Sequence, residues 1–276
     1  MTAQNRELAP LSGDAWKAID EEAGSVLRVM LAGRRLVDFN GPLGWETSAV
    51  DTGRVDETGI TLSEDVDVRR RKVHPLVEIR REFELSRAET EAIDRGAKDV
   101  DLDPAIDAAR NMALAEDGAI FNGLTDVGIE GIVPSATYDS LAISEDYENY
   151  PAVVAQAITT LRYAGVDGPY AIALGPKCYT GLNETTVNGF PVLNHVANLL
   201  DAPPVYAPSL DGAVVMSMRR GDFELSVGRD FSIGYLDHDA RSVRLFIEES
   251  FTFRVLGADA AIPLVYAKSP RKGKRS

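Results

Sequence analysis

Hydrophobic positions in the first part of the chain follow a helical period. From Ser12 to about Leu36, apolar residues recur every three or four positions, and this spacing predicts an amphipathic helix that Ser12 caps and that ends near Gly33. A second helix is predicted to begin at Asp103-Pro104, where an N-cap residue precedes a proline. It continues to about Gly123, and its alanine-rich faces favour close packing on both sides.

The last third of the chain follows the period of a strand. Apolar residues alternate with mostly polar ones from Val243 to Val255, which predicts a long, half-buried strand. The segment around Leu225 alternates likewise, so we expect the two strands to pair around a loop at Asp237-His238-Asp239. Between Gly131 and this pair of strands, the pattern predicts an α/β region. It contains helices over 152–163 and 192–200 and buried strands over 170–174 and 214–216.

A charged ribbon interrupts these patterns between Thr47 and Lys72. It holds short β-compatible stretches among many acidic and basic residues, with a turn signal at Thr58-Gly59. An isolated two-stranded hairpin is marginally stable in water, so we expect a neighbouring chain to order it. The alternative is a flexible, exposed hairpin.

Composition narrows the class of protein. The chain has 276 residues, of which 45% are apolar and 26% charged, and it carries a net charge of −14. It has neither a basic and apolar leader nor an apolar run of about 18 residues, so we expect no secretion signal and no membrane span. The single cysteine, Cys178, fits a reducing cytoplasm.

Charge is unevenly distributed along the chain. The last nine residues, 268–276, hold five basic residues and no acidic one, so the rest of the chain is more acidic still and should repel nucleic acid. We interpret this end as a solvated, disordered tail, with an RNA- or membrane-binding tail as the alternative.

Signals for catalysis are poor. There are three histidines and neither an H-E-x-x-H nor a G-x-S-x-G pattern. Asp99 to Asp103 resembles the start of a calcium loop, but Pro104 stands where glycine is required, so we interpret it as a helix-capping turn. Asp237-His238-Asp239 offers metal ligands, yet such residues in a hairpin turn usually face water. We expect neither an enzyme nor a metal site.

A set of unusual segments occurs in one order. They are Arg6-Glu7-Leu8-Ala9-Pro10-Leu11, Trp16, Gly33-Arg34-Arg35, Gly41-Pro42-Leu43-Gly44-Trp45-Glu46, Gly228-Arg229-Asp230-Phe231-Ser232-Ile233-Gly234-Tyr235 and Arg244-Leu245-Phe246-Ile247-Glu248-Glu249-Ser250-Phe251-Thr252-Phe253. Together they resemble the encapsulin (linocin-like) shell proteins of bacteria as far as about Leu264. The resemblance implies an α+β fold, the HK97 phage capsid-like fold, with a peripheral domain, an axial domain and an extended loop.

The resemblance also implies a division of the chain. The peripheral domain takes the N-terminal helix and arm (1–46), the segment with the long spine helix (76–131) and the return strands (222–267). The extended loop is 47–75, the axial domain 132–221 and the basic tail 268–276.

The function implied is a self-assembling, icosahedral shell in the cytoplasm, built from about sixty copies or a multiple. It would enclose a dye-decolorising peroxidase or a ferritin-like protein, with roles in oxidative stress or iron storage, held through an apolar C-terminal targeting peptide on this cargo. The alternatives are a viral or prophage major capsid protein of the same fold, and a secreted bacteriocin-like protein or peptidase.

By resemblance, a groove between the N-terminal helix and the peripheral domain binds the cargo peptide. The matching positions are Leu27, Met30, Leu31, Arg34, Asp38, Asp230, Phe231, Ile233 and Tyr235. The alternative is that Arg34 pairs with Asp38 or Asp230 inside the fold and that the apolar residues are core.

The resemblance assigns one polar loop to the fivefold pore. It comprises Asn183, Glu184, Thr185, Thr186, Val187, Asn188 and Gly189, for which the alternative is a plain surface loop. Some family members carry a flavin-associated tryptophan where this chain has Ser86-Arg87-Ala88, so we expect no bound flavin and no other cofactor.

Overall fold

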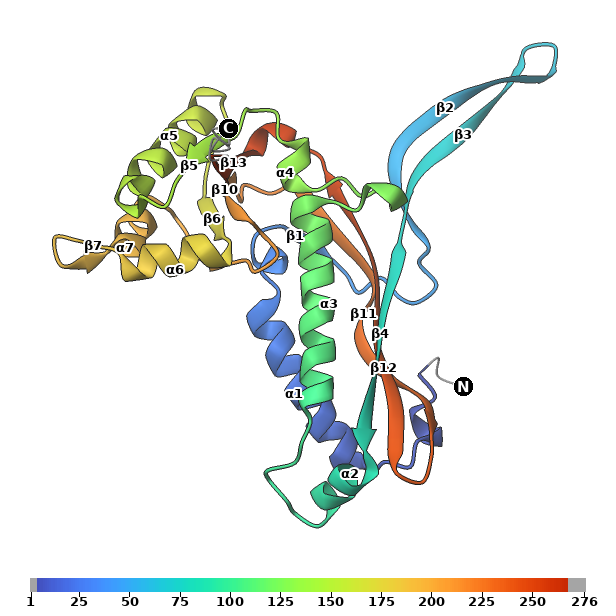
Figure 1. Ribbon diagram of the computed structural model, residues 1–276. Coiled ribbons are helices and arrows are strands. Elements are labelled where there is room, and N and C mark those ends of the chain that lie inside the picture. The colour runs from blue at the N-terminus through green and yellow to red at the C-terminus, as the bar shows by residue number, and fades with distance from the viewer. Residues whose placement is uncertain (1–3, 268–276) are drawn as a thin grey trace, which may run out of the picture.

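One long helix runs along a first β-sheet and ends close to a second one, and a hairpin arm projects away from both sheets (Figure 1). The computed structural model describes residues 4–267. The basic tail predicted over 268–276 lies outside the described residues. The fold is α+β, as the sequence predicts, because helices cover sheets without a regular alternation of strand and helix.

The peripheral part is a four-stranded sheet with helices packed on one face. Its order is β1-β11-β12-β4, and every neighbouring pair except the parallel β1 and β11 is antiparallel. The strands are β1 Asp38–Asn40, β4 Val77–Ser86, β11 Phe223–His238 and β12 Ser242–Val255; the helices are α1 Gly13–Met30, α2 Arg87–Asp94 and α3 Asp103–Asn122. Short 3-10 turns, η1 Arg6–Leu8 and η2 Gly33–Arg35, flank α1.

The axial part is a five-stranded sheet of order β5-β13-β10-β6-β9. Its strands are β5 Leu141–Ile143, β6 Tyr170–Leu174, β9 Val205–Tyr206, β10 Gly212–Ser217 and β13 Ala261–Tyr266; its helices are α4 Ile132–Ser135, α5 Tyr150–Tyr163, α6 Pro176–Glu184 and α7 Val192–Ala197. One expectation is corrected here. Strand β13 falls in the range assigned to the peripheral return strands, but it pairs with β10 and β5 and therefore belongs to the axial sheet.

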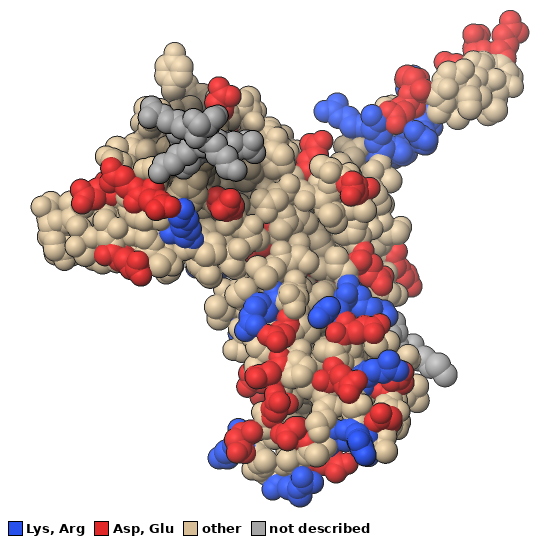
Figure 2. Space-filling model, viewed as in Figure 1, with Lys and Arg blue, Asp and Glu red and all other residues tan. Residues whose placement is uncertain are grey.

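The hairpin arm consists of β2 Ala49–Ser63 and β3 Val66–Pro75, which pair antiparallel. No residue described in either strand is buried. Figure 2 shows a basic band near the base of the arm, where Arg69 to Lys72 lie, and an acidic tip around Glu64 to Asp67. Between them, Ile60 and Leu62 are 55% and 74% exposed. An arm with this much free apolar surface needs a partner surface to cover it.

The ends of the two long helices follow from local contacts. Ser12 caps α1 as predicted, because its Oγ accepts a hydrogen bond from the Ala15 N–H at 3.0 Å. The helix ends at Met30, three residues before the predicted end near Gly33, where the chain turns toward the buried Asp117. Helix α3 begins at Asp103 rather than after it, so Leu102 and not Asp103 is the N-cap residue.

Strand β12 departs from the predicted half-buried pattern. Every residue from Leu245 to Phe253 is buried, including Glu248 and Glu249. Helix α3 covers one face of the strand. On the other face, Arg80 stacks over the ring of Phe246 at 4.0 Å and also pairs with Glu248. A long arginine side chain can cover a strand while its charged end stays near the surface. Burial of this kind cannot be predicted from the alternation of apolar and polar residues.

A buried charged layer separates two hydrophobic cores. Met112 of α3 and Ile247 of β12 belong to the peripheral core, whereas Ile120 and Phe251 of the same elements belong to the axial core. On each of these two elements, buried acidic residues lie in the sequence between the residues of one core and those of the other. They are Glu116 and Asp117 of α3 and Glu248 and Glu249 of β12. The charged layer therefore marks the junction of the two parts of the fold.

Candidate functional site

A cavity of about 300 Å³ opens between α1 and β11. Its lining combines an apolar floor with a polar rim; the residues are Gln4, Arg6, Asp20, Ala23, Gly24, Leu27, Phe231, Ser232, Ile233 and Ile247. We call this cavity the α1–β11 pocket. Its helical side comes from the positions 20, 23, 24 and 27 of α1, which the three- and four-residue spacing brings onto one face.

The N-terminal segment forms one rim of the pocket. The Gln4 carbonyl accepts a hydrogen bond from the Tyr235 N–H at 2.8 Å, so this segment lies against β11. Arg6 pairs with Asp20 of α1 at 2.7 Å and stacks over the ring of Trp16 at 3.9 Å. These contacts hold the segment beside the pocket, and no periodicity in the sequence could have predicted them.

Arg34 links the pocket to the charged layer. Its Nη1 pairs with Asp230 at 2.9 Å, and its guanidinium carbon lies 4.9 Å from the ring centroid of Phe231 in the pocket wall. Its Nη2 contacts Glu116 Oε2 at 2.6 Å and Glu249 Oε1 at 2.5 Å. Arg34 therefore pairs with Asp230, one of the two partners named in its alternative role, and also with Glu116 and Glu249, which were not predicted. It lies beside the pocket as well.

Burial changes the proton affinity of the acidic residues in the charged layer. Burial raises the pKa of Asp117 to about 7, although the backbone N–H groups of Gly33 and Ala32 donate hydrogen bonds to it. Burial, and then the nearby carboxyl group of Glu116, raise the pKa of Glu249 well above its ordinary value. A group buried away from water favours its neutral form.

The structure brings together some of the residues predicted to bind a peptide. Leu27, Phe231 and Ile233 line the pocket, and Arg34 and Asp230 lie next to it. Leu31 is buried, and Met30 is partly buried outside the lining. The Tyr235 side chain also lies outside it, because its hydroxyl bonds His238 Nδ1 at 2.5 Å.

Asp38 is not part of this pocket. Its Oδ2 accepts a hydrogen bond from the Gly221 N–H at 2.6 Å, and it borders a different cavity of about 630 Å³ beside β1. Conversely, seven lining residues of the pocket were not predicted as site residues; they are Gln4, Arg6, Asp20, Ala23, Gly24, Ser232 and Ile247. The helical spacing from Leu27 was a signal for Ala23 and Asp20, whereas nothing in the sequence pointed to the N-terminal segment.

The predicted pore loop is more regular than expected. Asn183 and Glu184 still belong to α6, and β7 Thr186–Val187 pairs with β8 Phe190–Pro191 in a hairpin. Its turn is Asn188-Gly189, both in the left-handed region with φ of 54° and 82°. Figure 1 shows this hairpin projecting from the axial part at the end away from the peripheral sheet.

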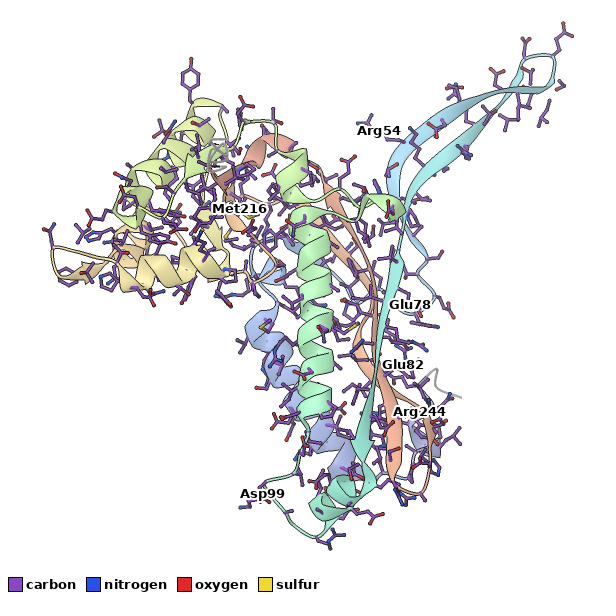
Figure 3. All side chains as sticks on the ribbon, viewed as in Figure 1. Arg54, Glu78, Glu82, Asp99, Met216 and Arg244 are labelled. Atoms are coloured by element: carbon purple, nitrogen blue, oxygen red, sulfur yellow. The ribbon has the colours of Figure 1, made fainter. Side chains whose placement is uncertain are left out.

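The Asp237-His238-Asp239 turn is occupied by internal contacts. His238 bonds Tyr235, Asp237 pairs with Arg244, and Asp239 Oδ1 accepts the N–H groups of Arg241 and Ser242. Figure 3 shows Arg244 at this end of the peripheral sheet. Among residues 4–267 no three acidic, histidine or cysteine side chains cluster so as to hold a metal ion. Nor is any helix of that part long and apolar enough to cross a membrane.

Solved structures define the class of protein. The fold matches a virus-like particle from Pyrococcus furiosus with a TM-score of 0.64 and 13% identity, over 90% of this chain and 98% of that one. Phage proteins, including the capsid protein of the myovirus XM1, share the fold as well. At such identities the likeness concerns the fold alone, which is the HK97 capsid-like fold of proteins that assemble in many copies.

Sequence relatives define the family. The family model described as "Encapsulating protein for peroxidase" matches residues 1–252. A type 1 encapsulin shell protein of Rhodospirillum rubrum is 51% identical over 94% of this chain and 95% of its own length. One of Rhodococcus erythropolis is 42% identical, over 96% of this chain and 100% of its own length. The chain belongs to the encapsulin shell protein family.

Proposed function

We propose that this chain forms a closed icosahedral shell of about sixty copies, or a multiple, in the cytoplasm and encloses a guest enzyme. The guest carries an apolar C-terminal targeting peptide, which binds in the α1–β11 pocket. The family description names a peroxidase as the enclosed protein. A peroxidase of the dye-decolorising class is therefore our first candidate for the guest, and a ferritin-like protein is the second. The corresponding roles are defence against oxidative stress and iron storage.

The observation that carries the proposal is the construction of the pocket. Ala23, Leu27 and Ile233 give it an apolar floor, and the Arg6–Asp20 ion pair gives it a polar rim. An extended peptide presents alternate side chains to the same side, so every second residue can enter the floor while its main chain meets the rim. A weak site suffices, because many copies in one shell retain an oligomeric guest together.

The arm supports the assembly part of the proposal. Its exposed Ile60 and Leu62 have no covering surface within the described chain and can be buried on a neighbouring subunit. The β7–β8 hairpin would then surround the fivefold pore. We further propose that the shell carries no flavin or other cofactor; in this chain Ser86-Arg87-Ala88 begins α2 without a tryptophan.

The first test is assembly and capture in one experiment. The chain is co-expressed with a fluorescent protein that ends in an extended tail with leucine or isoleucine at alternate positions. Size exclusion and negative-stain electron microscopy report hollow particles, and fluorescence per particle reports capture. Uniform shells that carry the fluorescent protein are the expected result. A monodisperse monomer or dimer would overturn the proposal that the chain forms a shell.

Substitutions in the pocket then separate capture from assembly. Leu27→Asp and Phe231→Ala should lower fluorescence per shell at least about tenfold, because the first places a charge in the apolar floor and the second removes an aromatic ring from the wall. Val29→Asp is the matched control, since Val29 is 68% exposed on α1 and lies outside the pocket. Intact shells that capture equally well in all three variants would rule out this pocket.

A further inference from the structure

Two buried carboxyl groups meet at one nitrogen of Arg34. Glu116 comes from α3 and Glu249 from β12, and the side chains of both are fully buried. Their oxygens lie 2.6 Å and 2.5 Å from the same Nη2 atom. The second oxygen of Glu249, Oε2, is buried and has no hydrogen-bond partner among the described residues.

Acidic groups outnumber basic ones around the Arg34 guanidinium. Arg34 of η2 faces Glu116 of α3, Glu249 of β12 and Asp230 of β11, and Asp117 of α3 lies alongside. The register partner of Glu249 on strand β4 is the uncharged Ile79. One guanidinium therefore serves two fully buried carboxyl groups as well as the partly exposed Asp230.

The neighbouring residue Glu248 has the opposite balance. It lies on the other face of β12, where Arg80 and Arg229 both pair with its carboxylate. Glu248 and Glu249 are both fully buried. Glu248 pairs with two cations, whereas Glu249 shares one cation with a second carboxyl group. Glu248 can therefore serve as a control for Glu249 within the same strand.

Ionising both Glu116 and Glu249 would leave an uncompensated charge in the interior, which costs several kcal/mol in proteins. This cost falls when one of two such close carboxyl groups keeps its proton. We infer that Glu249, whose second oxygen lies buried without a partner beside Glu116, is a proton-binding site at the junction of the two cores and holds its proton at neutral pH. The inference does not depend on guest binding in the α1–β11 pocket.

The proton has a structural consequence. With it bound, the Arg34 guanidinium bridges α3, β12 and the Asp230 segment of β11 without net repulsion between the two glutamates. When the proton leaves, the glutamates repel each other across Arg34. The folded state binds this proton more tightly than the unfolded chain, so its stabilising effect is present at low pH and is lost as the pH rises.

The test compares Glu249→Gln with Glu248→Gln in assembled full-length protein, by following the unfolding midpoint from pH 5 to pH 8.5. A glutamine at 249 keeps an acceptor for Arg34 and donates to Glu116 without needing a proton. We expect its midpoint to match the wild type near pH 5 and to exceed it by at least about 3 °C at pH 8.5. Glu248→Gln should lower the midpoint throughout, because it leaves two arginines without their carboxylate.

A spectroscopic measurement decides the question even if a variant fails to fold. Infrared spectra of wild-type shells in D₂O at neutral pH should contain the carbonyl band of a buried protonated carboxylic acid in excess of the partial contribution from Asp117, whose pKa is about 7. Glu249→Gln should weaken this band by the equivalent of one group per chain, and Glu248→Gln should leave it unchanged. The absence of this excess from the wild type, or an equal loss of stability in Glu249→Gln at every pH, would overturn the inference.

Discussion

The backbones of Gly123 and Gly131 touch where α3 passes into the axial part of the fold. A Cβ atom on Gly131 would lie 2.2 Å from the Gly123 nitrogen, and one on Gly123 would lie 2.8 Å from the Gly131 nitrogen. Gly123 also has a φ of +83°, in the left-handed region that favours glycine. This contact fixes how the helix that runs along the peripheral sheet joins the second sheet.

We therefore expect Gly131→Ala to destabilise the protein by at least about 1–3 kcal/mol, because backbone rather than a flexible side chain must move. The control is Gly118→Ala within α3, where an added Cβ meets nothing within 4 Å. It should be neutral or stabilising by up to about 1 kcal/mol. Thermal unfolding of both variants compares them; equal midpoints would contradict the role of the glycine contact.

Charges on the arm should prevent assembly without unfolding the subunit. The double variant Ile60→Asp and Leu62→Asp places two carboxylates where an apolar contact with a neighbouring chain is expected, and burying them is strongly unfavourable. Size exclusion should give subunits in place of shells, while far-ultraviolet circular dichroism remains unchanged. Glu64→Gln, in the turn at the tip, is the control and should assemble normally. Shells at wild-type yield from the double variant would count against the arm as an assembly element.

Asp117 should make stability depend on pH. Its pKa is about 7 in the folded chain against an ordinary 3.8, so its contribution to stability falls as the pH rises between these values. Asp117→Asn loses an acceptor for one of two backbone N–H groups and should be less stable at pH 5. The deficit should narrow by pH 8, where the wild type carries a buried charge. Unfolding midpoints measure this, with the exposed Asp107→Asn of the same helix as control; a constant deficit would contradict the raised pKa.

The thiol of Cys178 should be protected in the folded protein. It is fully buried and lies 3.2 Å from the Tyr150 hydroxyl and 3.3 Å from that of Tyr266. A thiol-specific reagent should therefore label native shells on the order of 100-fold more slowly than the chain in denaturant. Because the chain has one cysteine, a single labelling curve reports on this residue. Rapid labelling of native shells would mean that the axial core opens readily.

Features that depend on neighbouring residues could be predicted from the sequence. The cap at Ser12, the proline in the first turn of α3 and the alternation in β12 are all local signals, and the structure contains each corresponding element. The fold class followed from the ordered segments of the family. The long charged hairpin was also recognisable, because few apolar residues interrupt its turn and strand signals.

Features that depend on distant partners could not be predicted. Glu248 and Glu249 read as exposed residues of a strand, since their arginine partners lie far away in sequence. Asp38 and Arg34 are four residues apart, yet the turn between them directs their side chains to different cavities. The axial location of β13 could not be predicted either, because its pairing with the distant strand β10 is a tertiary contact.

The position of β13 also sets an order of events during synthesis. This strand lies between β5 and β10, so the axial sheet cannot close until residues 261–266 have left the ribosome. By then β4, β11 and β12 of the peripheral sheet have already emerged and can pair. A nascent chain thus lacks a complete axial surface until β13 has emerged, and subunits become competent to join a growing shell only after this strand has been made.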